Sequence, residues 1–125
     1  MITTVKEDFA KIPLSDAQIL ELYFVKDLCV RLKDWEERIF TLVFEDVAGM
    51  ECFGIVGEDL SHGTVDSTDP LIERASLASE ERVEGLWCFA LWSAWSENRV
   101  IRIVARSFKV TDRTEQRSEG SETLI

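Results

Sequence analysis

Histidine, cysteine and proline are scarce in this chain, which narrows the chemistry open to it. Its 125 residues include one histidine, three cysteines and two prolines. A lone histidine, His62, cannot build a multi-histidine metal site. Cys29, Cys52 and Cys88 lie far apart and form no Cys-x-x-Cys pair, so neither a disulfide framework nor a zinc site is indicated. We predict that the three thiols are buried and reduced, and that the protein uses no metal or cofactor.

Long apolar runs and an excess of basic residues are also missing. No segment reaches the roughly 18 apolar residues of a membrane span, and residues 1–18 lack the basic start and apolar run of a secretory signal. The net charge of −10 argues against nucleic acid and anionic membranes as partners, because binding phosphate groups requires a basic surface. The sequence therefore predicts a cytoplasmic protein.

Acidic residues are concentrated between Asp34 and Glu84. This segment contains 14 acidic residues and three arginines, a formal charge of −11, whereas the rest of the chain carries +1. Such a charge would suit a basic protein partner. The alternative is that it serves only to keep the protein soluble.

The most apolar stretch, residues 86–110, is the segment around which we expect the chain to fold. Two runs rich in aromatic and β-branched residues flank Ser96-Glu97-Asn98, a polar break typical of a tight β-hairpin turn. One face of the first run carries Trp87, Phe89, Leu91 and Trp95, and the other carries Leu86, Cys88, Ala90, Trp92 and Ala94. Because both faces are apolar, we predict a central strand in a sheet covered on both sides, with Trp92 and Trp95 in the core.

Alternating apolar residues predict further strands. They cover residues 28–33, 39–47 and 50–60. Residues 15–26 fit either a strand or a capped helix, because Ser15-Asp16-Ala17-Gln18 matches a capping box while the run is rich in strand-forming residues. We favour the strand.

The polar residues 61–84 interrupt this pattern of strands. A short helix could form near residues 70–82, with Asp69 as its N-cap and Pro70 in its first turn. The sequence thus predicts a mainly β fold, with α+β as the alternative. Its antiparallel sheets would form a sandwich or a partly open barrel of about six strands.

Three regions make up the expected domain organisation. Residues 1–14 form an N-terminal lead-in, and residues 15–110 form a single β-rich domain. Residues 111–125 are polar and lack periodicity until the last two, so we expect a disordered C-terminal tail.

Few residues could carry catalysis. His62 could act as a general base, but no nucleophile motif accompanies it, and we expect it in an exposed turn. We therefore assign no catalytic residue and favour a non-catalytic protein. The alternative is a small-ligand-binding or small enzyme domain, with a pocket formed by His62, Trp87 and Trp95.

Two sequence features resemble a recurring small bacterial domain type. One is Ser15-Asp16-Ala17-Gln18-Ile19 before a strand, with Ser15 where the pattern usually has His. The other is the rhythm of Leu28-x-Val30-x-Leu32 and Leu42-x-Phe44-Glu45-Asp46-Val47. Several such domains look like immunity proteins of contact-dependent or polymorphic toxin systems. The resemblance covers under half of the chain and implies a mostly antiparallel β domain that acts by binding.

The leading hypothesis is therefore a cytoplasmic binding protein of the immunity type, which covers a basic partner with an acidic face. The candidate binding residues are Glu45, Asp46, Glu58, Asp59, Asp66 and Asp69. A third hypothesis is an accessory domain that forms a homodimer through a sheet edge.

Overall fold

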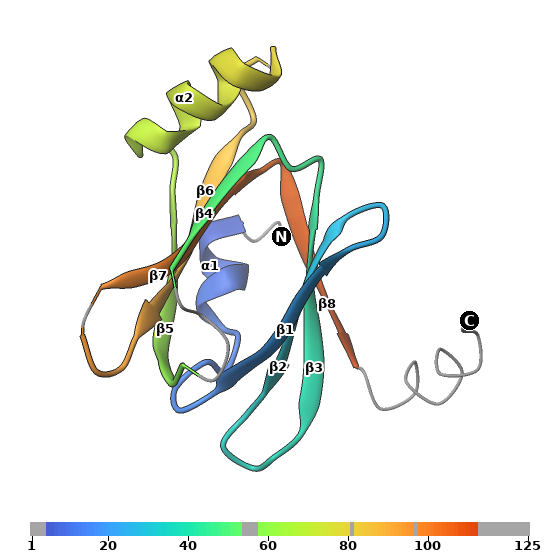
Figure 1. The fold of residues 1–125 in the computed structure, drawn as a ribbon, viewed down its shortest axis with the longest axis vertical. Helices are drawn as coiled ribbons and strands as arrows, with labels where there is room; N and C mark the ends of the chain where they lie inside the picture. The colour runs from blue at the N-terminus through green and yellow to red at the C-terminus, as the bar shows by residue number, and fades with distance from the viewer. Residues whose placement is uncertain (1–4, 54–57, 81, 97, 113–125) are drawn as a thin grey trace.

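The computed structural model describes residues 5–53, 58–80, 82–96 and 98–112, which form a sandwich of two antiparallel sheets (Figure 1). The first sheet has the order β1-β2-β3-β8 and contains β1 (Gln18–Phe24), β2 (Leu28–Lys33), β3 (Ile39–Glu45) and β8 (Ser107–Asp112). The second sheet has the order β4-β7-β6-β5 and contains β4 (Gly49–Cys52), β5 (Leu60–Asp66), β6 (Trp87–Ser93) and β7 (Arg99–Ala105). The mainly β, antiparallel fold is confirmed. Eight strands stand in place of the expected six or so.

The predicted hairpin is formed by β6 and β7, which pair antiparallel from Trp87↔Ala105 to Leu91↔Ile101. As expected, β6 is an inner strand, between β7 and β5. The chain leaves the second sheet at Arg106, whose backbone N–H donates to the Glu45 carbonyl at 3.1 Å. Residues 107–112 then pair with β3 in the first sheet. The stretch from 86 to 110 therefore contributes to both sheets.

The prediction that Trp92 and Trp95 belong to the core is not met. Trp95 is 79% exposed, because β6 ends at Ser93 and Trp95 lies in the turn that follows. Trp92 shares the outer face of the second sheet with Cys88 and Ala90, as alternation predicts, but it is only half-buried there. Alternation alone did not reveal where the strand ends.

Residues 15–26 form a strand, β1, as we favoured, but residues 50–66 differ from the prediction. The strand expected over 50–60 ends at Cys52 as β4, residues 54–57 lie outside the described residues, and a new strand, β5, begins at Leu60. His62 therefore lies in a strand and not in a turn, although its side chain is exposed. Polar residues fit β5 because it is an edge strand with one face toward solvent.

The helix α2 (Pro70–Ser79) confirms the predicted cap. The Asp69 carboxylate accepts the Leu71 backbone N–H at 2.9 Å, and Pro70 stands in the first turn. The apolar face of α2 packs on the outer side of the second sheet. This contact forms a small hydrophobic cluster, separate from the core between the two sheets, that contains Leu71, Ile72, Ala75, Leu86, Cys88 and Val104.

The three cysteines are free thiols, as predicted, but only one of them is buried. Cys88 is buried, Cys29 is half-buried and Cys52 is exposed. Burial raises the pKa of Cys88 to about 12, so this thiol remains protonated and inert at neutral pH.

No helix in the described ranges is both long enough and apolar enough to cross a membrane.

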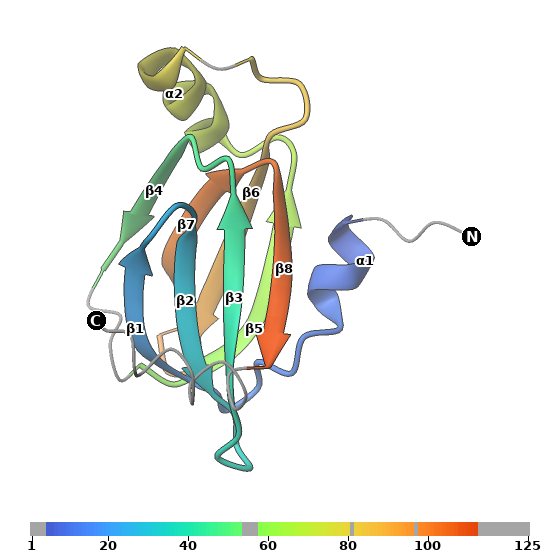
Figure 2. The ribbon, with the colours of Figure 1, turned by 90° about the vertical axis from the view of Figure 1, so that its right-hand side faces the viewer.

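The helix α1 (Val5–Ala10) closes one side of the sandwich, between β5 and β8 (Figure 2). Phe9 is 1% exposed, and its ring centroid lies 5.1 Å from that of Phe89 and 5.0 Å from that of Phe108. Gly63 on β5 permits this approach, because a Cβ there would lie 2.6 Å from Phe9 Cε2. Phe9, which the sequence analysis places in an N-terminal lead-in, is therefore part of the core. At the other terminus β8 extends to Asp112, and residues 113–125 of the expected tail lie outside the described residues.

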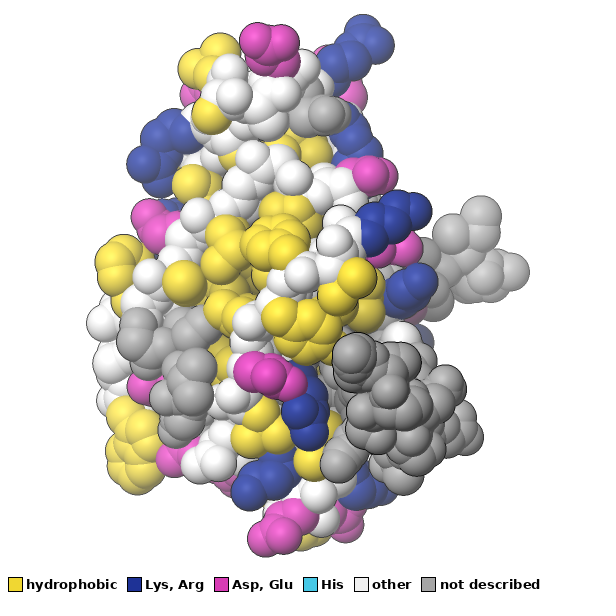
Figure 3. All heavy atoms as spheres, turned by 45° about the vertical axis from the view of Figure 1, so that its right-hand side comes forward, with side chains coloured by type: hydrophobic (Ala, Val, Ile, Leu, Met, Phe, Trp, Pro, Cys, Tyr) yellow, Lys and Arg dark blue, Asp and Glu magenta, His cyan; other side chains and the backbone are white. Residues whose placement is uncertain are grey.

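The opposite side of the sandwich, between β1 and β4, has no helix over it within the described residues. Leu22, Val47 and Met50 are half-buried and pack against the core. Figure 3 shows hydrophobic side chains along the middle of this face, with charged side chains of both signs around them.

A buried ionic cluster fastens α2 to the second sheet. The Asp69 carboxylate, 3% exposed, accepts hydrogen bonds from Arg99 Nη1 at 2.8 Å and Arg102 Nη1 at 3.0 Å. Arg102 in turn pairs with Glu51 on β4. The residue that caps the helix is therefore also the residue that ties it to β7.

Replacing Phe9 with Ala should lower the free energy of unfolding by about 3–5 kcal/mol, because a buried aromatic ring is lost and a cavity remains. The exposed Leu77 provides the control, since Leu77→Ala should change stability by no more than about 0.5 kcal/mol. Urea unfolding of both variants measures the difference. Equal stabilities would mean that α1 does not contribute to the core.

Replacing Asp69 with Ala should destabilise the fold by about 3 kcal/mol, because Arg99 and Arg102 lose a buried partner and α2 loses its cap. Asp66→Ala is the matched control. Asp66 is exposed and accepts only local hydrogen bonds from Thr68, so about 1 kcal/mol or less should be lost. The midpoint of urea unfolding reports both, and similar losses would show that Asp69 does not fasten the helix.

Candidate functional site

Trp95 is the most exposed aromatic residue in the part of the chain that the structure describes, at 79%. Its indole Nε1–H donates to Asp59 Oδ2 at 3.0 Å, and its backbone N–H donates to Ser93 Oγ at 3.1 Å. The indole is therefore held by Asp59 and the backbone of Trp95 by Ser93, while most of the side chain faces solvent. Large exposed aromatic rings that are fixed in place are typical of binding surfaces.

Asp59 connects the two sheets at this end of the sandwich. Its Oδ1 accepts from Gln18 Nε2 at 2.8 Å, so the same carboxylate holds the start of β1 and the indole of Trp95. Its backbone carbonyl accepts the Ala94 N–H at 2.9 Å. Hydrogen bonds from Gln18 and then Trp95 lower the pKa of Asp59 below its usual value, so it stays ionised at neutral pH.

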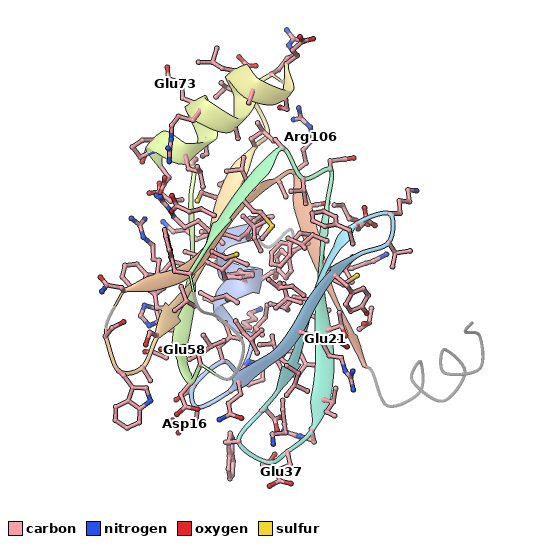
Figure 4. All side chains as sticks on the ribbon, viewed as in Figure 1. Asp16, Glu21, Glu37, Glu58, Glu73 and Arg106 are labelled. Atoms are coloured by element: carbon pink, nitrogen blue, oxygen red, sulfur yellow. The ribbon has the colours of Figure 1, made fainter. Side chains whose placement is uncertain are left out.

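Glu58 and Asp16 bring two further carboxylates to this end. Ser93, which is buried, donates its hydroxyl to Glu58 and accepts the Trp95 N–H, so it links the two residues. The Asp16 backbone N–H donates to the Leu60 carbonyl at 2.9 Å, which places Asp16 beside the residues that follow Glu58. Asp16 has a φ of 63°, a conformation that aspartate tolerates better than most residues. Figure 4 shows Asp16 and Glu58 at the same end, away from Glu73 on α2. We call Asp16, Glu58, Asp59 and Trp95 the Trp95 cluster.

The carboxylates of the Trp95 cluster differ from six others in how they are neutralised. Glu21, Asp34, Glu36, Glu45, Glu51 and Asp69 each form an ion pair with an arginine or a lysine. Among the described residues, none of the three in the cluster has a basic side chain within ion-pair distance. The side-chain donors to Glu58 and Asp59 are neutral: Ser93, Gln18 and Trp95. Asp59 therefore contacts the indole, Glu58 is linked to Trp95 through Ser93, and Asp16 lies at the same end of the sandwich, and none of the three forms an ion pair within the described residues.

A groove opens beside the cluster. Its volume is about 580 Å³, and its lining includes Phe53, Glu58, Arg99 and Arg102. The two arginines are paired with Asp69 and Glu51. Phe53 is 66% exposed, so a second aromatic ring lies at the solvent boundary of this groove. Space and aromatic surface are thus available next to Trp95.

The other predicted binding residues lie elsewhere. Glu45, at the end of β3, accepts from Ser107 Oγ at 2.7 Å and pairs with Lys109 at 3.5 Å. Asp46 lines a different groove, Asp66 accepts from Thr68, and Asp69 fastens α2. The structure brings Glu58 and Asp59 together and separates them from the remaining four. The acidic segment from 34 to 84 runs between both ends of the sandwich, as the positions of Glu37 and Glu73 show (Figure 4).

The structure does not bring His62, Trp87 and Trp95 together. The His62 ring stacks on Trp92, with centroids 5.4 Å apart and planes at 10°. Trp87 packs against the core, and Trp95 lies in the turn after β6. Within the described ranges, no group of three or more histidines, cysteines and acidic residues could hold a metal ion.

Two members of the cluster have roles that the sequence analysis missed. The sequence places Asp16 in a capping pattern and in the element that carries the family resemblance, and it predicts Trp95 in the core or in a pocket with His62. The one local signal was Ser93, a polar residue two positions before Trp95 that interrupts the apolar run. The pairing of Trp95 with Asp59 spans 36 residues and is a tertiary contact.

Comparisons with known proteins offer no relative from which a role could be transferred. No family model, no curated protein and no solved structure matches the chain.

Proposed function

We propose that this chain is a non-catalytic protein that binds a basic protein partner through the Trp95 cluster. The observation that carries the proposal is the 79% exposed indole of Trp95, which is held by the Asp59 carboxylate, a group that forms no ion pair with any described basic side chain. The proposal keeps two of the predicted binding residues, Glu58 and Asp59. It replaces a continuous acidic face with one end of the sandwich.

Tryptophan is suited to the centre of a protein interface. It buries a large area on binding and loses little conformational entropy, particularly when its rotamer is already fixed. Trp95 meets this condition because its indole N–H and backbone N–H are both hydrogen-bonded. The carboxylates around it would attract a basic surface and orient it during encounter.

An immunity-type inhibitor is the form of this function that we favour. Residues 14–60 resemble a small bacterial domain type, several members of which look like immunity proteins of toxin systems, and this resemblance supports the proposal together with the charge of the cluster. In such a role a cytoplasmic protein covers the basic active site of a toxin. The inhibitor itself performs no chemistry.

Replacing Trp95 with Ala should weaken partner binding by about 2–4 kcal/mol, as expected for a central aromatic residue, mainly through faster dissociation. Stability should change little because the ring is exposed. Leu77→Ala, with 78% exposure on α2 at the other end, is the matched control and should bind normally. Surface plasmon resonance with a partner captured on the immobilised chain measures both. A partner that binds Trp95→Ala as tightly as the natural chain would refute this use of the cluster.

Charge can be tested separately with a triple variant that converts the three carboxylates to amides: Asp16→Asn, Glu58→Gln and Asp59→Asn. Each amide keeps one acceptor oxygen, so the side chain of Asp59→Asn can accept from Gln18 or from Trp95 but not from both, and urea unfolding of the variant checks that the fold is retained while three charges are lost. The association rate at low salt should fall about tenfold, and its dependence on ionic strength should flatten.

A second triple variant removes as many charges from the α2 end: Glu73→Gln, Glu80→Gln and Glu84→Gln. Its association rate should stay close to that of the natural chain. Equal slowing in the two variants would mean that the partner responds to net charge and not to the Trp95 cluster.

A further inference from the structure

We propose that the group recognised by the Trp95 cluster is an arginine side chain of the partner. Its guanidinium group would stack on the exposed indole and pair with the carboxylates beside it. This inference rests on the proposed function and specifies the chemistry of its site.

The chain itself contains an arginine that is held in the way we propose for the arginine of the partner. The guanidinium carbon of Arg99 lies 5.5 Å from the ring centroid of Trp92, and Arg99 Nη1 donates to Asp69 Oδ2 at 2.8 Å. An arginine is thus held between an indole and a carboxylate. Trp95 and Asp59 also present an indole and a carboxylate, in contact at 3.0 Å, and Asp59 forms no ion pair with an arginine in the described part of the chain. Arg99 and Arg102, which line the adjacent groove, are paired instead with Asp69 and Glu51.

The hydrogen bonds of Trp95 leave its ring open to such a ligand. Asp59 occupies the indole N–H, which lies at the edge of the ring and not on its face. The aromatic faces attract cations, and tryptophan does so more strongly than tyrosine or phenylalanine. The ring that is 79% exposed therefore offers the preferred surface for a cation.

The carboxylates have room for the donors of a guanidinium group. Each oxygen of Asp59 accepts one neutral donor, from Gln18 or Trp95, and an ionised carboxylate can accept about four hydrogen bonds in all. Glu58 receives one hydroxyl, and Asp16 adds a third charge at this end. The site therefore combines unused acceptors with uncompensated negative charge.

Arginine fits this combination better than lysine. Its guanidinium group is planar, so it can lie flat on the indole while its N–H groups point sideways to a carboxylate. A lysine ammonium is more strongly hydrated and offers a point charge without a flat face. Selectivity between the two is the property that separates this inference from simple attraction between opposite charges.

The test uses three blocked tripeptides of Gly-X-Gly, in which X is arginine, lysine or citrulline. Citrulline has nearly the shape of arginine without the charge. Each peptide is titrated into the full ¹⁵N-labelled chain, and the indole N–H signals are followed by NMR, with Trp95 assigned from a Trp95→Phe variant. The Trp95 signal should shift saturably with the arginine peptide, with about fivefold tighter binding than for lysine. The citrulline peptide should cause no shift.

Trp35 is the internal control because its side chain is also exposed, at 66%, beside Glu36, which is paired with Arg38. Its indole signal should not move. Asp16→Asn/Glu58→Gln/Asp59→Asn should abolish the shift at Trp95, whereas Glu73→Gln/Glu80→Gln/Glu84→Gln should preserve it.

Three results would overturn the inference: equal affinity for arginine and lysine, equal shifts at Trp95 and Trp35, or binding that survives loss of the three carboxylates. The two proposals can fail separately. A protein partner that requires Trp95 while the peptides show no preference for arginine would leave the proposed function standing and remove the arginine. If the arginine peptide binds selectively but the protein partner binds Trp95→Ala as tightly as the natural chain, the arginine site stands and the proposed function fails.

Discussion

The contact between aromatic rings inside the sandwich is the interaction on which the rest of the structure depends. Phe9 from α1 lies among Phe44, Phe89 and Phe108, which come from strands of both sheets. Because these rings fill the space between the sheets, the charged residues must lie on outer faces or at the ends of strands. Filling this space also depends on Gly63 and Arg106. The absence of a side chain at Gly63 lets Phe9 of α1 approach β5, and at Arg106 the chain passes from the second sheet to the first, so that Phe89 and Phe108 come from different sheets.

The charged groups divide into those that build the fold and those that the fold leaves available. Asp69 and Arg102, which are buried or nearly so, neutralise each other and hold α2 on the second sheet. Glu45 is neutralised by Lys109 on a neighbouring strand of the first sheet. Asp59 is different because neutral donors hold it, so the fold is maintained while its charge remains uncompensated. A net charge calculated from composition cannot distinguish these situations.

Local pattern revealed much of the fold and less of the site. Alternation located β2 and β3, and Asp69-Pro70 located the start of α2, because these signals come from neighbouring residues. It misplaced Trp95, since alternation does not show where a strand ends, and it missed β5, whose polar side chains suit a sheet edge. Glu58 and Asp59 were selected for their charge. Their association with Trp95 and Asp16 arises only when residues far apart in the sequence meet at one end of the sandwich.

The two indole–carboxylate arrangements show how one chemistry serves two purposes. Beside Trp92 the carboxylate is Asp69, which is buried, caps a helix and binds the chain's own arginines. Beside Trp95 the carboxylate is Asp59, which is half-buried, caps no helix and is bound by uncharged donors. Turns at the end of a rigid sheet can change without disturbing the core, so they are where binding residues are placed at little cost in stability. An exposed tryptophan gains nothing for the fold by remaining in water, and the hydrogen bonds that fix its indole add to the entropy lost on folding. Under the proposed function, this ordering precedes partner binding and lowers its entropic cost.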